Sequence, residues 1–283
     1  MANSTTTNLA ALQSQIVQEA LFTASERSIM RGLVSEFAVP MNSGATARVP
    51  IYPTKDAVAV AEGTDLAGGA GDVSVATTTK DIAISEVGIM TNLTDLAKDT
   101  SEQNVVAHLG RVFGDAIAKK MDTDLIALMA GFSTDVGAAN TEMTVQDLFE
   151  AAAELRSNSA PGPYYGVFHP KAIFNVKKGL TNTFGGTSLS DVGNQAMREG
   201  FIGTIAGIQI FESSNFTIDG DDDSVGGVFA KEALGVAIQG DMNIEIQRDA
   251  SLRADEIVAT MRYGTSELID AYGVRIQADT RAN

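Results

Sequence analysis

The chain has 283 residues, of which 44% are hydrophobic and 20% charged, a composition typical of a folded globular protein and not of a disordered one. Its 36 acidic residues outnumber 20 lysines and arginines, and the resulting net charge of −16 argues against tight nucleic-acid binding by the whole molecule, because such a surface repels phosphate. The chain has no cysteine, which excludes disulfides and thiolate metal sites.

Residues 1–44 are predicted to form an N-terminal arm. Its first residues have neither the basic nor the apolar region of a signal peptide, and no apolar stretch of the chain approaches the roughly 18 residues that a membrane span needs, so we expect no membrane contact. The arm carries apolar residues near helical spacing at Leu9, Leu12, Ile16 and Leu21. Pro40 and Gly44 close it, and its apolar face must dock on its own domain or on a neighbour.

Residues 45–94 are predicted to form an extended β-ribbon. Apolar residues alternate in Ala45–Pro53, and Pro50 and Pro53 confine this strand to a sheet edge or a two-stranded ribbon, because proline cannot donate to a ladder. Residues 80–90 are the expected partner strand, with a bulge near Ser85-Glu86 where the apolar parity switches. Small and glycine-rich residues form the tip between the strands.

An isolated two-stranded ribbon is marginally stable in water. This ribbon has little to pack against within its own chain, so we expect it to lie on another subunit. The candidate subunit-interface residues are Val49, Ile51, Lys55, Glu62, Asp65, Ile82 and Ile84.

A long helix, the spine, is predicted over residues 102–129, which would span about 40 Å. Thr100 with Gln103 matches a capping box, and Gly110 and Gly114 require close packing against the helix. The predicted apolar face consists of Val105, Leu109, Val112, Phe113, Ile117, Leu125 and Leu128.

Residues 141–240 alternate between helix and strand. Thr144 and Asp147 open a helix, Tyr164–Phe168 is a strand, and Pro170 begins the next helix. A further helix is predicted near Ser188–Met197, and Asp219–Asp223 reads as an exposed acidic turn. Short strands are expected at Val225–Ala230, Val236–Gln239 and Ile244–Gln247.

The C-terminal part contains two strands with clean alternation, at residues 257–263 and 272–276, with Gly264 predicted to turn the chain between them. Both are expected to pack with the spine. The predicted fold class is therefore α+β, with a peripheral domain made of residues 95–140 and 241–283 and an axial domain, residues 141–240, inserted into it.

The sequence offers poor candidates for catalysis. His108 and His169 are about sixty residues apart in different predicted units, and each is better explained by packing or capping. Gly186–Ser190 lacks the second glycine of a nucleophile elbow, and Asp219–Asp223 lacks the distal glutamate of an EF-hand, although a loose surface calcium site is the alternative to a solvated turn. We therefore predict no catalytic, metal-binding or cofactor-binding residues, and no enzyme activity.

The order of these elements resembles that of the tailed-phage major capsid protein family, whose fold is named after phage Hong Kong ninety-seven. The matching motifs are Val60-Ala61-Glu62-Gly63, Thr91-Asn92-Leu93-Thr94-Asp95-Leu96, Lys119-Lys120-Met121-Asp122, Val167-Phe168-His169-Pro170, Gly203-Thr204-Ile205-Ala206-Gly207-Ile208-Gln209-Ile210, Tyr263-Gly264 and Asp270-Ala271-Tyr272-Gly273-Val274. Some family members form a covalent crosslink from a lysine in the extended loop. Lys55 lies in the corresponding segment, but no partner can be assigned to it, so that chemistry is not carried over.

The resemblance implies a structural protein of the virion, made in the host cytoplasm, that assembles with copies of itself into the pentamers and hexamers of an icosahedral shell around double-stranded DNA. It also implies a portal and, because the arm is short, a separate scaffolding protein, with only weak non-specific DNA contact. The alternatives are an encapsulin-type nanocompartment shell, a soluble hydrolase with an unrecognised carboxylate pair, and a phage decoration or adhesion protein.

Overall fold

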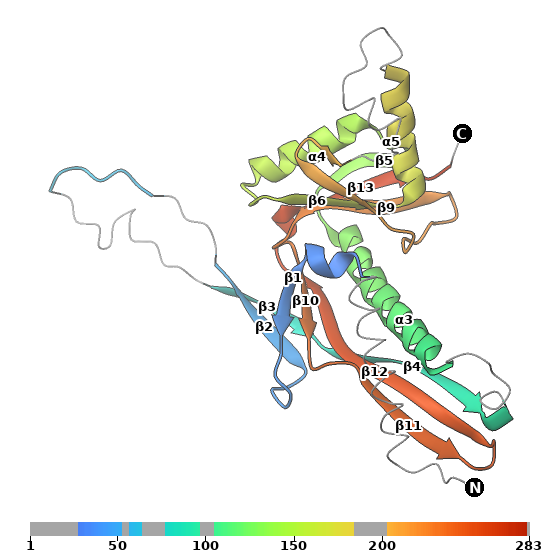
Figure 1. Ribbon diagram of the computed structural model, residues 1–283. Coiled ribbons are helices and arrows are strands. Elements are labelled where there is room, and N and C mark those ends of the chain that lie inside the picture. Colours follow the sequence, from blue (N-terminus) through green and yellow to red (C-terminus); the bar gives the residue numbers. More distant parts are fainter. Residues whose placement is uncertain (1–27, 53–56, 64–76, 97–104, 184–202, 282–283) are drawn as a thin grey trace.

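The computed structural model describes residues 28–52, 57–63, 77–96, 105–183 and 203–281, except for the side chains of residues 105–107 and 180–183. Several predictions lie outside these residues: the amphipathic helix of the arm, the Thr100–Gln103 cap, the helix near Ser188–Met197 and the Gly186–Ser190 segment. Within the described residues the molecule has two units, each built on one sheet, and a two-stranded ribbon that projects from between them (Figure 1).

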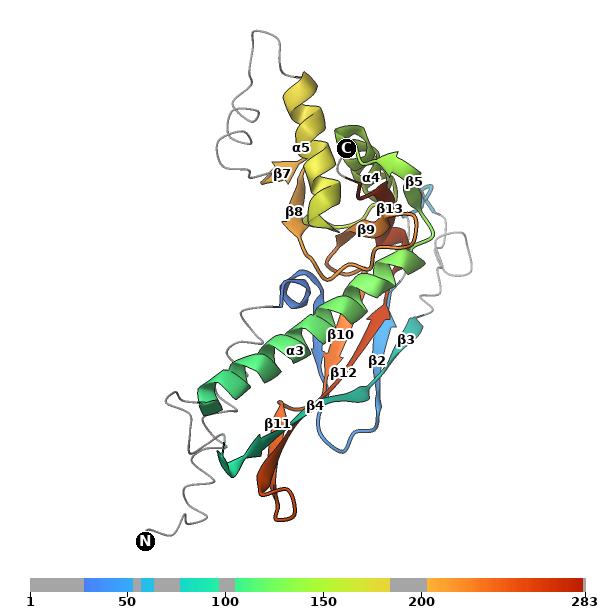
Figure 2. The ribbon, with the colours of Figure 1, turned by 90° about the vertical axis from the view of Figure 1, so that its right-hand side faces the viewer.

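The first unit is a five-stranded sheet with the long helix α3 (Val105–Leu128) lying across one face (Figure 2). Its central strand is β12 (Ala254–Glu267), in which buried residues alternate with more accessible ones, so that Ile257, Ala259, Met261 and Tyr263 are buried towards α3. The other strands are β1 (Ser35–Ala38), β4 (Ser85–Thr94), β10 (Leu234–Ile238) and β11 (Asn243–Asp249), and the 3-10 helix η1 (Met30–Leu33) precedes β1.

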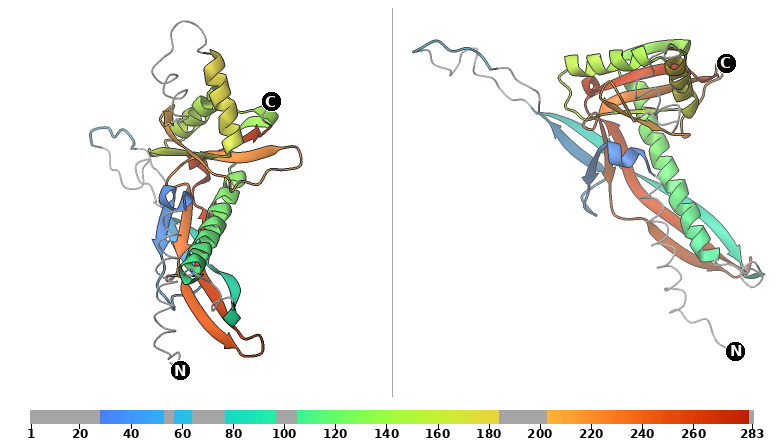
Figure 3. Two further views of the ribbon diagram at one scale, coloured as in Figure 1. Left: turned by 45° about the vertical axis from the view of Figure 1, so that its right-hand side comes forward. Right: turned by 45° about the horizontal axis from the view of Figure 1, so that its top comes forward.

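The second unit is a six-stranded sheet with helices α4 (Val145–Ser157) and α5 (Pro170–Thr183) on one face (Figure 3). The strand order is β5-β13-β9-β6-β8-β7. The bounds are β5 (Asp135–Glu142), β6 (Tyr164–Phe168), β7 (Thr204–Ile205), β8 (Ile208–Glu212), β9 (Asp223–Ala230) and β13 (Gly273–Asp279), with short 3-10 helices η2 (Met129–Gly131) and η3 (Asp270–Tyr272) nearby.

The two units share one continuous core because neighbouring residues of β6 point to opposite faces of the six-stranded sheet. Phe168 packs under α4 and α5, whereas Val167 belongs to the same hydrophobic cluster as Phe113 and Leu125 of the spine. Phe229 of β9 joins that spine cluster as well. The C-terminal end of α3 thus packs beneath the sheet that carries α4 and α5.

The helix predictions are confirmed where local signals define the ends. Thr144 caps α4: its hydroxyl accepts from the backbone N–H of Asp147, and the Asp147 carboxylate accepts from the Thr144 N–H at 2.7 Å. Pro170 begins α5, and α3 covers most of the predicted spine. The predicted apolar face of the spine is wrong at Val112, whose side chain is 54% exposed.

Two strand placements and one turn were predicted wrongly. β13 lies in the six-stranded sheet and not with the spine, because Val274 and Ile276 pack under α4 and α5. β10 belongs to the five-stranded sheet although its residues fall within 141–240. Alternation indicates a half-buried strand but does not identify its partner.

The turn predicted at Gly264 is wrong, because β12 continues through this residue to Glu267. Gly264 instead marks the place where the ribbon crosses β12, since a Cβ there would overlap the carbonyl oxygen of Ala83. Glycine is required at this position by close approach of a second backbone.

The ribbon consists of β2 (Thr46–Ile51) and β3 (Thr78–Ala83), paired antiparallel, and the proline-based prediction of a two-stranded ribbon is confirmed. The predicted bulge near Ser85-Glu86 is wrong. The chain changes sheets at Ile84, whose N–H donates to the Ala45 carbonyl at 2.8 Å, and β4 then pairs with β12 in an unbroken ten-residue register. The change of partner explains the switch in apolar parity.

Candidate assembly surfaces

The base of the ribbon is covered by its own chain. Ala47 and Ile82 are buried against Ala237 of β10 and Leu268, where the ribbon crosses the five-stranded sheet. The interface prediction for Ile82 is therefore wrong, because its side chain has no exposed surface. Val49, Ile51 and Ile84 pack at the margin of the same cluster and are half-buried, so only part of each side chain can reach another subunit.

The tip of the ribbon is different. Residues 57–63 are all exposed, and Val58 and Val60 each keep 46% of their surface accessible. The candidate Glu62 lies in this exposed segment. Lys55 and Asp65 fall outside the described residues. Of the candidate interface residues, Glu62 is thus the only one that the described structure places wholly on the surface.

Large hydrophobic side chains are exposed along the whole length of the molecule and not gathered at one cleft. Met90 lies in the middle of β4, and Leu96 just beyond β4 and Leu252 in the β11–β12 turn lie at the far end of the five-stranded sheet. Phe149 on α4 and Phe174 on α5 are exposed on the other unit. Sequence periodicity places none of these residues at a contact surface, because it reports only which residues are apolar.

The far end of the five-stranded sheet is held by an ion-pair network. Arg248 of β11 donates two hydrogen bonds to the carboxylate of Asp95, at 2.5 and 2.6 Å, and a third to Asp255 at 3.1 Å. These hydrogen bonds raise the pKa of the Arg248 guanidinium above its ordinary value, and the hydrogen bond to Asp95 contributes most. The network ties the end of β4 to the β11–β12 hairpin, so the exposed side chains there sit on a fixed backbone.

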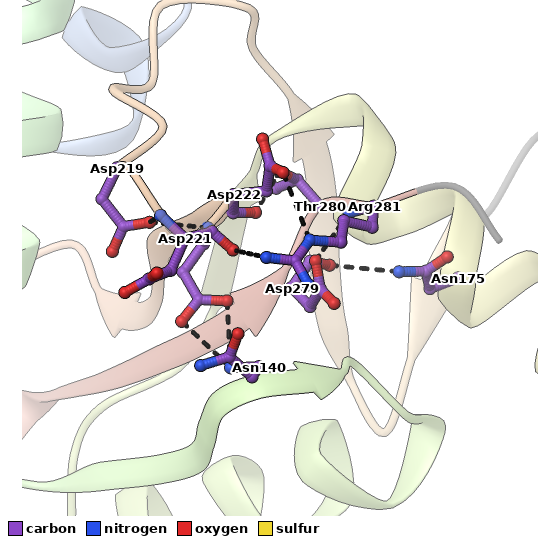
Figure 4. Close-up of polar contacts among 9 residues, drawn as sticks. Asn140, Asn175, Asp219, Asp221, Asp222, Asp279, Thr280 and Arg281 are labelled. Carbon is purple, nitrogen blue, oxygen red and sulfur yellow. Dashed lines mark hydrogen bonds and ion pairs between the residues drawn. The ribbon is translucent and has the colours of Figure 1, made fainter.

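The acidic turn is braced by the C-terminal end of the described chain (Figure 4). Asp219 accepts from the backbone N–H groups of Asp221 and Asp223, at 3.0 and 2.8 Å. Arg281 pairs with the Asp222 carboxylate at 3.2 Å and donates to the Asp221 carbonyl at 2.7 Å. The turn is therefore held in place by its own backbone and by a cation.

The prediction that all of Asp219–Asp223 is exposed is wrong for its last residue. Asp223 is buried and accepts from the backbone N–H of Asn140 at 3.0 Å and from the Gln277 amide at 3.2 Å. It begins β9 and joins the neighbouring strands, which local sequence does not reveal. Among the described residues, no group of three or more His, Asp or Glu side chains is placed to hold a metal ion.

The two histidines are not brought together. His169 caps α5, because its Nδ1 accepts from the Lys171 N–H at 3.2 Å, and burial, with the nearby Lys171 charge, lowers its pKa. His108 is exposed on α3. A cavity of about 470 Å³ near β10 and β11 is lined by Met41, Met242 and Met261 together with charged side chains, and no histidine faces it. None of the described helices is both long and apolar enough to cross a membrane.

Comparison with known proteins identifies the family. Residues 77–276 match the model of the family described as phage capsid protein. The fold is similar to the capsid structure of the cyanophage P-SCSP1u, with 19% identity, coverage of 88% of this chain and 87% of that chain, and a TM-score of 0.69.

Two further solved structures have similar folds. The capsid of Ralstonia phage GP4 has 10% identity, coverage of 88% of both chains and a TM-score of 0.69. The SrpI encapsulin of Synechococcus elongatus PCC 7942 has 14% identity, coverage of 90% of this chain and 89% of that chain, and a TM-score of 0.65.

No match is found among curated proteins. The α+β fold predicted from the order of the elements is confirmed, and because the family model covers most of the chain, the chain belongs to the phage capsid protein family.

Proposed function

We propose that the chain is the major capsid protein of a tailed phage, and that copies of it form the pentamers and hexamers of an icosahedral shell around double-stranded DNA. Its place is then the virion, after synthesis in the host cytoplasm. The observation that carries the proposal, beyond family membership, is the exposed ribbon tip with Val58 and Val60. Burying these side chains on a second copy would stabilise a contact by on the order of 1 kcal/mol each.

The ribbon suits this role because its base is packed in the chain's own core, whereas the described tip residues 57–63 are all exposed. The base is fixed by Ala47 and Ile82 in the chain's own core, so the ribbon leaves the five-stranded sheet from a fixed position. The proposed peripheral unit (the five-stranded sheet with α3) and axial unit (the six-stranded sheet with α4 and α5) share a continuous core. A subunit of this kind can transmit load across a shell without a flexible joint between its units.

The test is assembly. The chain is coexpressed with its candidate scaffolding protein and examined by sedimentation velocity and negative-stain imaging, and we expect closed particles in the megadalton range. The double variant Val58→Asp, Val60→Asp should stay small, because two carboxylates would have to be buried at the contact. Val112→Asp, on a comparably exposed valine of α3, serves as the folded control. A wild-type chain that stays monomeric under every assembly condition would contradict the proposal.

An encapsulin-type shell is the second candidate, and the fold similarity to the SrpI encapsulin favours keeping it. The contents of purified particles distinguish the two functions. A phage capsid copurifies with double-stranded DNA during infection, whereas a nanocompartment contains a cargo protein. The portal, the separate scaffolding protein and the weak DNA contact belong to the first function only.

A hydrolase receives no support from the buried acid Asp122. Asp122 of α3 is buried and its pKa is raised by desolvation, which is the sign expected of a catalytic acid. Its oxygens, however, accept hydrogen bonds from Ser28, Ile29 and Met30, at 2.7, 3.0 and 3.2 Å. The carboxyl group anchors the start of the described chain to the spine and does not line the cavity.

A further inference from the structure

The ribbon is joined to the five-stranded sheet at two places (Figure 1). On one side, β3 runs through Ile84 directly into β4, and the N–H of Ile84 donates to the Ala45 carbonyl at 2.8 Å. On the other side, residues 39–45, here called the entry turn, connect the end of β1 to the start of β2. Because β1 belongs to the sheet and β2 to the ribbon, the conformation of the entry turn affects the direction that the ribbon takes.

One buried side chain holds both ends of the entry turn. The amide nitrogen of Gln239 donates to the carbonyl oxygen of Pro40 at 3.2 Å and to that of Gly44 at 3.1 Å. Both partners are acceptors, so the amide group must present its nitrogen to the turn and not its oxygen. Gln239 is 9% exposed. A single amide group therefore closes the turn from the side of the sheet.

The backbone of Gln239 is itself fixed in the sheet. Its N–H donates to the Arg262 carbonyl of β12 at 2.9 Å, which continues the β10–β12 ladder by one residue. Residues two apart in a strand point to the same face, so Gln239 lies on the face of Ala237. Ala237 packs against Ala47 and Ile82 of the ribbon base. The amide thus reaches the entry turn from a fixed position beside the packed base.

The entry turn has a backbone that needs contacts from outside. Asn42 has a φ of 67° and Gly44 a φ of 101°, both in the left-handed region, which costs free energy for a residue that carries a Cβ. The side chain of Met41 lies over Gly240, since a Cβ added to Gly240 would come within 2.6 Å of the Met41 Cε. Gln239 and its neighbour Gly240 therefore both hold the turn against the sheet.

The surroundings allow the turn to come away from the sheet. The cavity of about 470 Å³ adjoins the turn, and both Met41 and Gln239 lie in its wall. The wall also contains Asp241 and Arg262, and a cavity that is polar and roomy admits water. Water can bond to the two carbonyl groups once the amide releases them. The joint thus has a closed arrangement and an accessible open one.

We propose that Gln239 is a latch that sets the direction in which the ribbon leaves the sheet. When the latch is closed, the entry turn is held and the ribbon crosses β12 at Gly264. When it is open, the ribbon is attached through Ile84 and the apolar contacts of its base, and it swings about them. The purpose of the latch rests on the proposed capsid function, because an assembling subunit has to present its ribbon in one direction. Gln239 acts through the turn and is a positioning residue.

The latch is tested in the unassembled chain by measuring the distance between ribbon and spine. The chain has no cysteine, so spin labels can be attached at Thr79→Cys on β3 and Val112→Cys on α3, both exposed, for double electron–electron resonance. Gln239→Met keeps the length of the side chain and removes both donors. Two hydrogen bonds favour the closed form by a factor on the order of ten to a hundred, so the distance distribution should broaden in Gln239→Met. Gln247→Met, at an exposed glutamine of β11, is the matched control and should change nothing.

A second variant tests the direction of the hydrogen bonds. In Gln239→Glu a carboxylate would face two carbonyl oxygens, whereas the neutral acid can donate to one of them. The distribution should therefore be broad at about pH 8 and become narrower at about pH 5.5, because burial raises the pKa of a carboxyl group. Glu86, Asp241 and Glu245 line the same cavity, and Arg262 is paired with Glu86 at 3.4 Å. The chain that keeps Gln239 is therefore measured at both pH values and should not change.

The outcomes separate the latch from the proposed function. A Gln239→Met distribution that matches the chain with Gln239 in width and mean overturns the latch, and so does a Gln239→Glu distribution that does not respond to pH. If Gln239→Met does not fold, Gln239→Asn takes its place with the same expectation, because its amide is one methylene shorter and cannot reach both carbonyl groups. These results leave the capsid function standing, whereas a wild-type chain that forms no particles counts against that function and not against the latch.

Discussion

Replacing Gly264 by alanine tests the crossing of the ribbon over β12. A Cβ at this position would overlap the Ala83 carbonyl oxygen and would lie 2.8 Å from its carbonyl carbon and 3.1 Å from Cγ2 of Ile82. The carbonyl atoms are backbone and cannot rotate away, so β3 must move off β12 and expose part of Ile82. Overpacking costs about 1–3 kcal/mol, and partial exposure of an isoleucine adds about 1 kcal/mol. We expect the free energy of unfolding to fall by about 2–4 kcal/mol.

The assay is urea unfolding of the unassembled chain, followed by circular dichroism. The midpoint should fall with little change in the slope, because the surface exposed on unfolding is nearly the same. Hydrogen exchange in Thr78–Ala83 should become faster, since that segment must move. Gly179→Ala in α5 is the matched control: its Cβ would meet nothing within 4 Å, and alanine should stabilise the helix by about 0.5–1 kcal/mol. An unchanged midpoint for Gly264→Ala would refute the crossing.

Three further changes probe the core. In urea, Ile82→Ala should lower the free energy of unfolding of the unassembled chain by about 2–5 kcal/mol, whereas Val58→Ala should change it by no more than about 0.5 kcal/mol. Equal effects would contradict the burial of the ribbon base. Asp223→Asn should lower the free energy of unfolding by about 1–3 kcal/mol, because an amide nitrogen replaces a carboxylate oxygen that accepts hydrogen bonds from Asn140 and Gln277. An unchanged melting temperature would contradict this. Desolvation raises the pKa of Asp122 above 3.8, so the folded state holds this proton more tightly than the unfolded state does. The free energy of unfolding should therefore fall as pH rises from about 4 through the raised pKa. The urea midpoint of Asp122→Asn should not show this pH dependence.

Much of the local structure could be predicted from the sequence, because neighbouring residues carry the signals. The capping box of Thr144 and Asp147, the helix start at Pro170 and the alternation at residues 257–263 each depend on contacts within a few residues. Pro50 indicated a ribbon because its missing donor is a property of the residue itself. The order of these elements was also enough to identify the capsid family.

Only the tertiary structure decided which surfaces are covered. The same alternation that marked residues 272–276 as a strand was compatible with either sheet, and the packing of Ile276 under the helices placed it in the second unit. Ile82 looked like an interface residue until the crossing at Gly264 buried it. The partner of β4 became visible only from its register with β12. A pattern along one strand records which face is apolar, whereas the identity of the neighbour depends on segments more than a hundred residues away.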